Sequence, residues 1–447
     1  MSSPYVAHRR ALMERLADSG AAAVVFTATT KIRNHDCEYR FRPDSDFWYL
    51  TGFAEPDAAL LLLPDLEGEG DHRSVLFLRE RDPEREIWDG RRLGVERAPE
   101  TLEVEEARPI EDLWDDLSVD LKGYERILYR TGQDPERDRQ MLAIVEGLRR
   151  RARGSIRPPV ELLDHAPFVH EQRLLKNAAE LERMRKAAAI TTEAHMAAMA
   201  TATPGMNERE IDALLDYTFR RRGSTGAAYG NIVAGGANAC VLHYVENDAE
   251  LGAEDLLLID AGAEYEYYAS DVTRTFPVSG TFSEPQRELY EVVLAAQEAA
   301  IRHVRPGVTF ESIHGVALQR LVEGLVELGL CSGTAEEVIS SGDYRRFFMH
   351  QTSHWLGLDV HDCGFYSSEG ASRSLEPGMV LTVEPGLYVD PEEDGIQERW
   401  LGIGIRIEDD VLVTAEGHEV LTAGVPKSVE AVEAACKARH EPRGGPA

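Results

Sequence analysis

The sequence predicts two domains of different fold class: an α/β domain over residues 1–170 and an α+β domain with a largely antiparallel sheet over residues 171–425. Its length of 447 residues exceeds what one hydrophobic core usually serves. In the first part, apolar strand-like runs alternate with helix-like segments, as they do in α/β folds. Prolines then interrupt this periodicity within residues 155–167, which marks the linker between the two domains.

The elements expected in the N-terminal domain follow from the length and period of its apolar runs. Short, almost continuous apolar runs are typical of buried strands, whereas a longer segment with helical spacing indicates a helix. The expected strands are residues 21–27, 58–63 and 74–78, and the expected helix is residues 134–149.

The second domain is expected to combine long helices with short strands. Over residues 171–199 the apolar residues share one helical face, and Glu, Arg and Lys pairs occupy the rest. Asn207 is an N-cap candidate with Glu210 three residues later. The other expected elements are helices at 207–222 and 284–304, strands at 256–260, 268–276, 379–383, 403–407 and 410–413, and a flexible Ala- and Glu-rich tail at 426–447.

Charge and cysteine content limit the possible partners. The formal net charge of −31 repels phosphate backbones and anionic lipid, so neither nucleic acid nor a membrane surface is an expected partner. No apolar stretch approaches the roughly eighteen residues of a membrane span. The five cysteines are scattered and contain no CxxC pair, so neither a disulfide framework nor a structural zinc site is expected. These features indicate a cytoplasmic protein.

Two aspartates lie in a predicted strand–turn–strand segment. Asp260 ends the first strand and Asp271 lies within the second. A hairpin centred between Tyr265 and Glu266 would make the two aspartates cross-strand partners. Facing carboxylates repel each other, and one would stay protonated unless a cation lay between them. An isolated pair of this kind is also compatible with a simple turn.

Three further residues favour a metal site. Glu384 follows an apolar run, Glu408 ends a run in which every second residue shares a face, and His354 lies in an aromatic-rich stretch near His350 and His361. A lone histidine there would fit a buried core residue. Three histidines within twelve positions, together with four carboxylates in apolar surroundings, favour a shared site instead.

The candidate ligand set is rich in oxygen. One imidazole and four carboxylates suit hard or borderline divalent ions such as Mn²⁺ better than they suit a selective Zn²⁺ site. Two divalent ions would balance the four carboxylates, and a bridging hydroxide would leave one negative charge. Arg406 can offset that charge because it lies two positions before Glu408, on the same strand face. An ordinary surface arginine is the alternative interpretation.

Several of these motifs resemble those of a known family. The contexts IDAGAEYEYYASDVTRTFP, HWLGLDVHD, LTVEPGLYV and GIGIRIEDD resemble the pita-bread metallopeptidases, which include methionine aminopeptidase, prolidase and aminopeptidase P. SDFWYLTGF and EIWDGRRLG, in the N-terminal domain, resemble bacterial aminopeptidase P in particular. The resemblance covers the chain up to about residue 425. It implies an aminopeptidase P/creatinase type of N-terminal domain and a pita-bread catalytic domain.

The resemblance also implies roles for the metal ligands. Asp271 and Glu408 would bridge two divalent ions, with Mn²⁺ expected, while Asp260 would complete one ion and His354 with Glu384 the other. A hydroxide between the ions would attack the bond between the N-terminal residue and a proline in second position.

Other residues are assigned by the same resemblance. His243 in ACVLHYVEN and His361 would assist the substrate carbonyl and the tetrahedral intermediate, His350 would be a further active-site histidine, and Glu384 would also shuttle a proton. Trp88 and Asp36 would help to form the substrate site, with domain packing as the alternative role for Trp88. Gln351 stands where the family often has Gly, which leaves the ligand spacing intact.

The expected function is therefore that of an Xaa-Pro aminopeptidase, in a homodimer or homotetramer. A prolidase, which cleaves Xaa-Pro dipeptides, would share the metal ligands. Methionine aminopeptidase fits less well because it does not need an N-terminal domain of this length. A metal-free binding module of the same fold fits poorly because all five ligand types are present.

Overall fold

The computed structural model describes residues 3–66, 72–152 and 157–438. The chain forms two compact units, Met1–Arg173 and Leu174–Ala447, whose boundary lies close to the predicted one. Each unit is described by itself.

The N-terminal unit contains a six-stranded mixed sheet in the order β6-β5-β4-β1-β7-β8. β4 pairs antiparallel with both β1 and β5, whereas the pairs β1–β7, β5–β6 and β7–β8 are parallel. The three predicted strands correspond to β1, β4 and β5. The bounds are β1 Ala21–Phe26, β4 Ala59–Leu63, β5 Arg73–Leu78, β6 Glu106–Pro109, β7 Arg126–Leu128 and β8 Glu161–Leu163.

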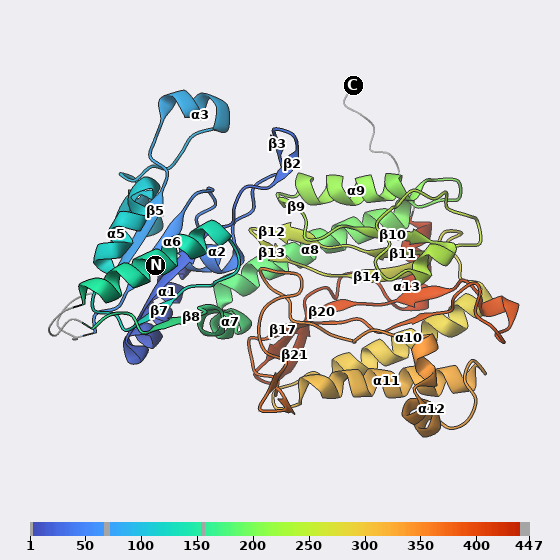
Figure 1. Cartoon of the computed structure of the whole chain (residues 1–447). Helices are drawn as coiled ribbons and strands as arrows, with labels where there is room; N and C mark the ends of the chain where they lie inside the picture. Colours follow the sequence, from blue (N-terminus) through green and yellow to red (C-terminus); the bar gives the residue numbers. More distant parts are fainter. Residues whose placement is uncertain (1–2, 67–71, 153–156, 439–447) are drawn as a thin grey trace. The chain divides into compact units, whose positions relative to one another are not determined.

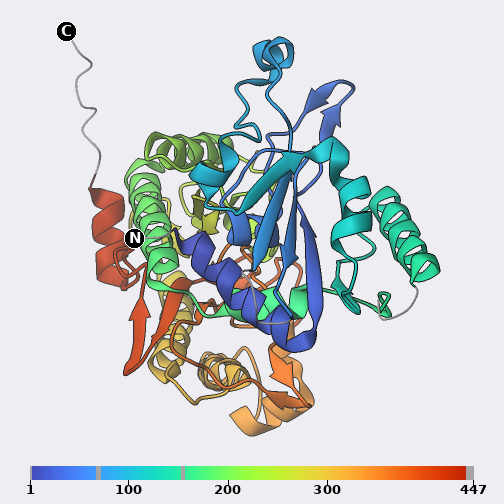
Figure 2. The ribbon, with the colours of Figure 1, turned by 90° about the vertical axis from the view of Figure 1, so that its left-hand side faces the viewer.

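Helices cover both faces of this sheet, because its central strands are apolar on both sides. Alternate strand residues such as Val24 and Leu61 join one core cluster with Leu117 of α5 (Leu113–Asp120) and Ile144 of α6 (Pro135–Arg151). Figure 2 shows α1 (Pro4–Ser19) on the opposite face. The predicted helix at 134–149 corresponds to α6, and Asp134 caps its first turn.

Several short elements complete the unit. The hairpin β2–β3 and the helix α3 extend away from the sheet (Figure 1). The bounds are β2 Ile32–Asn34, β3 Cys37–Glu38, α2 Ser45–Thr51, α3 Pro83–Asp89, α4 Ala98–Leu102, the 3₁₀ helix η1 Ile110–Asp112 and α7 Ala166–Leu174.

In the C-terminal unit, α8 and α9 lie on one side of the strands and the packed pair α10 and α11 on the other (Figure 1). Asn207 and Glu210 form the predicted capping box of α9, and α10 corresponds to the predicted third helix. The bounds are α8 Ala178–Thr201, α9 Glu208–Arg221, α10 Glu284–His303, α11 Phe310–Glu327, α12 Ala335–Ser341 and α13 Val429–Lys437, with 3₁₀ helices η2 Gly236–Cys240, η3 Asp343–Arg346 and η4 Glu398–Trp400.

The prediction of one helix over residues 171–199 is wrong in one respect. The segment forms the end of α7 and then a separate helix, α8. The cause is Asn177, whose side chain accepts from the backbone N–H groups of Ala179 and Glu180 and so starts a new helix. The Glu180 side chain accepts in return from the Asn177 N–H and closes the capping box.

All strand pairs described in the C-terminal unit are antiparallel, which confirms the predicted fold class. The sheets are ordered β10-β11-β14, β13-β12-β9, β17-β20-β21, β18-β19 and β15-β16. The bounds are β9 Gly226–Ala227, β10 Ile232–Gly235, β11 Leu256–Asp260, β12 Ala263–Tyr265, β13 Tyr268–Ala269, β14 Thr273–Pro277, β15 Ser367–Ser368, β16 Ala371–Ser372, β17 Val380–Val383, β18 Gly386–Tyr388, β19 Gly404–Arg406, β20 Asp409–Thr414 and β21 Gly417–Val420.

The predicted register of the aspartate hairpin is wrong. Asp260 pairs with Thr273 rather than Asp271. The turn lies one residue later than predicted, because Glu266 and Tyr267 both adopt positive φ, at 45° and 66°. The predicted strand 268–276 is also interrupted between β13 and β14. Here the backbone of Gly262 approaches that of Ser270 so closely that a Cβ on Gly262 would lie 1.6 Å from the Ser270 carbonyl oxygen.

The structure differs from the predicted flexible tail over part of residues 426–447. Ser428 caps α13, and Val429, Val432 and Ala435 bury one apolar face of this helix. Helical spacing of apolar side chains explains the difference. Residues 439–447 lie outside the described part of the chain. Within the described part, no helix combines the length and the apolar composition needed to cross a membrane.

Candidate active site

A cavity of about 940 Å³ in the C-terminal unit contains most of the predicted site residues. Its lining includes eight of them: His243, Asp260, Asp271, His350, His354, His361, Glu384 and Arg406. Glu408 lies beside them and is almost fully buried. The predicted residues Asp36 and Trp88 belong to the N-terminal unit and are not part of this cluster.

The carboxylates converge because the ends of several strands of the C-terminal unit meet here. Asp260 ends β11, and Asp271 lies in the short connection between β13 and β14. Glu384 follows β17, and Glu408 lies between β19 and β20, with its N–H donating to the Thr273 carbonyl at 3.0 Å. Acidic residues that end apolar strands are thus brought together in the interior, as their sequence context suggested.

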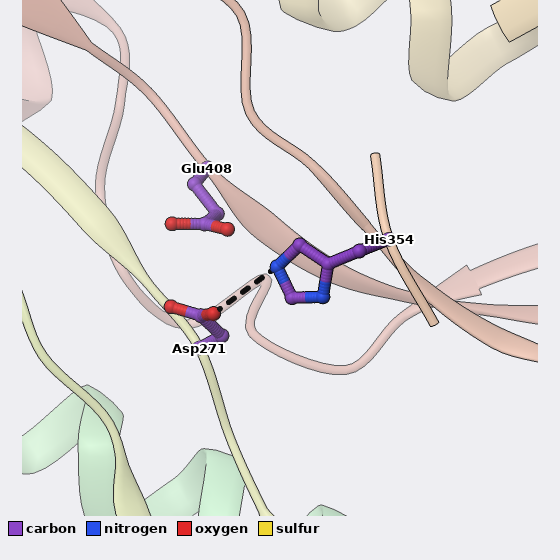
Figure 3. A group of neighbouring side chains, drawn as sticks. All are labelled: Asp271, His354 and Glu408. Atoms are coloured by element: carbon purple, nitrogen blue, oxygen red, sulfur yellow. Dashed lines mark ion pairs between the residues drawn. The ribbon is translucent and has the colours of Figure 1, made fainter. Parts of the chain in front are cut away.

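His354 lies among these carboxylates with one nitrogen facing them. Its Nε2 is 3.4 Å from an oxygen of Asp271 and 3.5 Å from an oxygen of Glu384, and Figure 3 shows the ring directed toward Asp271 with Glu408 beside it. Its Nδ1 lies 3.0 Å from the Trp355 carbonyl, to which it can donate. That contact favours the tautomer whose Nε2 carries a free lone pair, which is the form that binds metals.

The described residues contain one group of His, Cys, Asp or Glu side chains close enough to share an ion. It consists of Asp271, His354 and Glu408, whose ligand atoms all lie within 4.8 Å of one another. Asp260 and Glu384 line the cavity beside this group. Carboxylate oxygens and one imidazole nitrogen form a donor set suited to divalent cations.

The charges of this cluster are unbalanced without a cation. Burial raises the pKa of Asp260 and raises that of Glu384 to about 7. Burial, followed by the charge of Asp271, raises the pKa of Glu408 well above its usual range. Burial acts against protonation of His354, but its hydrogen bond to Asp271 and the charge of Glu384 outweigh this and raise its pKa to about 9. Burial also acts to raise the pKa of Asp271, but its hydrogen bond with His354 outweighs this and lowers it. Three of the four carboxylates thus have raised pKa values, so the cluster is matched to added positive charge.

Arg406 supplies a fixed positive charge beside the cluster. Its guanidinium donates to Asp260 at 2.5 Å, to the Thr273 hydroxyl at 3.1 Å and to the Tyr388 hydroxyl at 3.0 Å. The Thr273 hydroxyl in turn donates to Glu408 at 2.7 Å. With 3% exposure, Arg406 is not a surface arginine, and it orients two of the carboxylates through these contacts.

Two tyrosines belong to the site but were not predicted from the sequence. The Tyr229 hydroxyl lies between Asp260, at 2.7 Å, and Asp271. Burial, followed by the Asp260 charge, raises the pKa of Tyr229 well above its usual value, so it remains a donor. Tyr388 contacts Arg406 and His350. Tyr388 follows Glu384 by four positions, but that spacing alone does not distinguish it from the other buried aromatic residues.

The histidines near the cluster are in different environments. His350 is held by the Gln351 carbonyl at 2.7 Å and the Tyr388 hydroxyl at 2.9 Å, and burial, followed by the charge of Arg406, lowers its pKa to about 4. The ring of His361 packs edge-on against His354 with centroids 4.4 Å apart, and burial followed by the His354 charge lowers its pKa. His243 lines the cavity together with the exposed Val245.

A buried histidine next to the backbone of the site makes the stability of the fold sensitive to acid. His195 of α8 is fully buried, and its Nε2–H donates to the Ala261 carbonyl at 3.0 Å. Burial lowers its pKa from 6.5 to about 4. Between pH 6.5 and 4, His195 is therefore neutral in the folded chain but protonated in the unfolded chain. Its contribution to the free energy of unfolding is present above pH 6.5 and is lost as the pH falls toward 4.

His195→Gln keeps an N–H donor but does not titrate. The loss of unfolding free energy between pH 6.5 and 4 should then shrink by about 3 kcal/mol. Denaturant unfolding across this pH range, in chelator so that metal release does not contribute, measures the difference. The solvent-exposed His35→Gln is the control. An unchanged slope in His195→Gln would contradict the prediction.

Comparison with known proteins identifies the family. The chain matches metallopeptidase family M24 over residues 182–415 and the aminopeptidase P N-terminal domain over residues 5–129. It is 45% identical over 426 residues to the Xaa-Pro aminopeptidase of Escherichia coli, covering 95% of this chain and 96% of the relative. It is 46% identical over 413 residues to the Xaa-Pro aminopeptidase of Haemophilus influenzae, covering 92% of each chain.

Solved structures agree in fold. Aminopeptidase PepP of Pseudomonas aeruginosa matches with a TM-score of 0.93 and 45% identity, over 97% of both chains. A substrate complex of an E. coli aminopeptidase P variant matches with a TM-score of 0.93 and 44% identity, over 97% of this chain and 98% of that one. These findings confirm the resemblance read from the motifs: the chain belongs to metallopeptidase family M24, with an aminopeptidase P type of N-terminal domain and a pita-bread catalytic domain.

Proposed function

We propose that this chain is an Xaa-Pro aminopeptidase, which releases the N-terminal residue from peptides with proline in second position. The observation that carries the proposal is a cluster of five residues: Asp260, Asp271, His354 and Glu384 line one cavity, and Glu408 lies beside them. It occurs in a chain aligned over almost its full length with relatives of that name. The proposed substrates are peptides with an N-terminal Xaa-Pro sequence.

We propose that the five residues hold two divalent cations, with Mn²⁺ as the expected metal. Asp271 and Glu408 would bridge, Asp260 would complete one ion, and His354 and Glu384 the other. The buried, mutually repelling carboxylates support this arrangement because added cations would balance their charge. When bound, the cations would supply a nucleophilic hydroxide near neutral pH and would polarise the scissile carbonyl.

The chain's own side chains would perform the remaining steps. Glu384 lines the cavity at the end of β17, and its carboxylate can accept a proton and pass it to the leaving proline nitrogen. His361 and His243 line the cavity and can donate hydrogen bonds to negative charge that develops on the substrate oxygen. Asp260 would attract the free amine of the substrate, which would restrict cleavage to the first peptide bond. Tyr229 and Arg406 would keep Asp260 oriented.

A peptide panel tests the proposal. The purified protein with Mn²⁺ is expected to release the first residue from Xaa-Pro-Yaa peptides and to leave Xaa-Ala-Yaa peptides largely intact. Chelator should abolish the release, and divalent metal should restore it. Equal rates on Xaa-Ala-Yaa would defeat the proline assignment. Cleavage of Xaa-Pro dipeptides without cleavage of tripeptides would favour a prolidase instead.

We further propose that Asp36 and Trp88 contribute to substrate binding in a homodimer or homotetramer. The support is their unusual exposure. The Asp36 side chain is 86% exposed in the β2–β3 turn, and Trp88 is 85% exposed on α3, next to Ile87 at 79%. Large exposed apolar pairs are typical of contact surfaces. The five cysteines, which are free, support a cytoplasmic location.

Trp88→Ala is expected to lower kcat/KM on Xaa-Pro peptides by roughly tenfold, or ~1.4 kcal/mol, because a large aromatic contact is lost. The structure predicts little effect on folding, since Trp88 is exposed. Steady-state kinetics on tripeptides and longer peptides, with light scattering for oligomeric state, provides the check. Val119→Ala, at an exposed position of α5, is the matched control. Unchanged kinetics on every peptide length would remove Trp88 from the site.

A further inference from the structure

His361 lies on a segment that regular secondary structure does not position. Residues 356–366, all of which the structure describes, contain neither helix nor strand. The segment begins after Trp355, which forms an isolated bridge with Leu381, and ends before β15. Specific side-chain and backbone contacts must therefore set the position of His361 in the cavity.

The residue next to His361 carries such a contact. His361 faces the cavity, whereas Asp362 is 6% exposed and points into the protein. The Nζ of Lys176 donates to Oδ2 of Asp362 at 3.0 Å, and both side chains are only 1% exposed. The Asp362 N–H also donates to the Trp355 carbonyl at 2.9 Å. The peptide unit beside His361 is thus held at both its backbone and its side chain.

Lys176 is itself held at a defined place. It lies in the short connection between α7 and α8, directly before the capping residue Asn177. Its N–H donates to the Gly378 carbonyl at 2.9 Å, which ties this connection to the turn before β17. The Lys176 ammonium group therefore extends from a fixed backbone that leads directly into helix α8.

Close packing leaves the pair little freedom. A Cβ added to Gly357 would lie 2.1 Å from Oδ2 of Asp362 and 3.0 Å from Cε of Lys176. The Gly357 carbonyl accepts from the Ala269 N–H at 2.8 Å, which ties the start of the segment to the strand before Asp271. The ion pair therefore lies between the loop that carries His361 and the backbone that leads to a predicted metal ligand.

We propose that Lys176 and Asp362 are the positioning pair for His361: their buried ion pair fixes the loop so that the imidazole reaches the substrate oxygen in the transition state. The proposal rests on the proposed function of this site. Neither residue touches the substrate, and both act through His361. A hydrogen bond to developing charge is sensitive to displacement, because a misplacement of about 1 Å can lower the rate by about 10²-fold.

The pair must be distinguished from a purely structural ion pair. Removing one partner of a buried pair leaves an uncompensated charge and destabilises the fold, whatever the pair's role. Stability alone therefore does not test the proposal. A positioning role predicts a fall in kcat with little change in KM and no change in bound metal, and it predicts that the effect disappears once His361 is absent.

The experiment is a double-mutant cycle on the metal-loaded protein with an Xaa-Pro-Yaa peptide. Lys176→Met should lower kcat by about 10- to 100-fold with an intact His361, and by less than about twofold in the His361→Ala background. Metal per chain should match the wild type. Lys186→Met, an exposed lysine on α8, is the matched control and should leave kcat unchanged.

A second variant keeps the test decisive if Lys176→Met does not fold. Lys176→Met/Asp362→Leu removes both charges and leaves no unpaired ion in the core. It should fold and show the same loss of kcat, again only when His361 is present. A wild-type kcat in this variant, or equal losses with and without His361, would overturn the proposal. A wild-type protein inactive on Xaa-Pro-Yaa would instead defeat the proposed function.

Discussion

Asp271→Asn is expected to abolish metal binding and peptidase activity together, with a loss of activity of at least about 10³-fold, equivalent to more than about 4 kcal/mol of transition-state stabilisation. A bridging carboxylate has both oxygens directed at cations. The amide of asparagine has a similar size but offers one neutral oxygen, so one anionic contact and half of the bridge are lost. Asp271 also lies at the centre of the cluster, within reach of both His354 and Glu408.

The same substitution should leave the metal-free fold nearly as stable as the wild type. Losing the Asp271 charge relieves repulsion with Glu408 and Asp260, whose pKa values are raised by burial and by this neighbour. It also removes the ion pair with His354, which opposes that gain. The Tyr229 hydroxyl can still donate to the asparagine oxygen. These opposing changes predict a net effect within about 1 kcal/mol in chelator.

Two measurements separate the metal effect from a folding defect. Elemental analysis after dialysis against limiting Mn²⁺ gives metal per chain, and thermal melts with and without Mn²⁺ give the stabilisation that binding adds to the native state. Wild type should melt at a higher temperature in Mn²⁺, and Asp271→Asn should show almost no increase. Asp216→Asn, on α9 outside the cavity, should behave as wild type. Two tightly bound metals in Asp271→Asn would show that Asp271 is no bridge.

Part of the candidate site could be predicted from the sequence because some of its residues follow a local rule. Glu384 and Glu408 lie at the ends of apolar runs, and Asn207 begins a helix through a capping box that spans only four residues. Such signals depend on neighbours in the chain. The class of each domain followed in the same way from the order and length of its apolar runs.

Features that depend on contacts between distant segments could not be predicted. The register that pairs Asp260 with Thr273 is set by a turn of two non-glycine residues with positive φ, for which the sequence carries no clear signal. Tyr229 contacts Asp260 from 31 positions away, and Lys176 contacts Asp362 from 186 positions away. Neither partner stands out by composition or spacing, so only the folded chain reveals them.

His361→Ala should lower kcat by about 10² or more while KM changes little and metal is retained, because a hydrogen bond to a developing oxyanion strengthens as charge appears. The structure supports this role by geometry: the imidazole lies edge-on to His354 at 4.4 Å and lines the cavity, but it is not in the group of closely spaced ligand atoms. Removing it should therefore leave the metal ligands in place.

Graded variants of His361 distinguish a donor to the transition state from a group that binds substrate. His361→Gln retains an N–H donor and should recover part of the kcat lost in His361→Ala, whereas His303→Ala, on α10 away from the cavity, should leave kcat unchanged. Metal analysis must accompany the kinetics, since a loss of metal would lower kcat without any change in hydrogen bonding. A near-normal kcat with a raised KM would assign His361 to substrate binding. When metal analysis shows that the metal content is unchanged, the loss of kcat in His361→Ala gives the cost of removing the imidazole from this position.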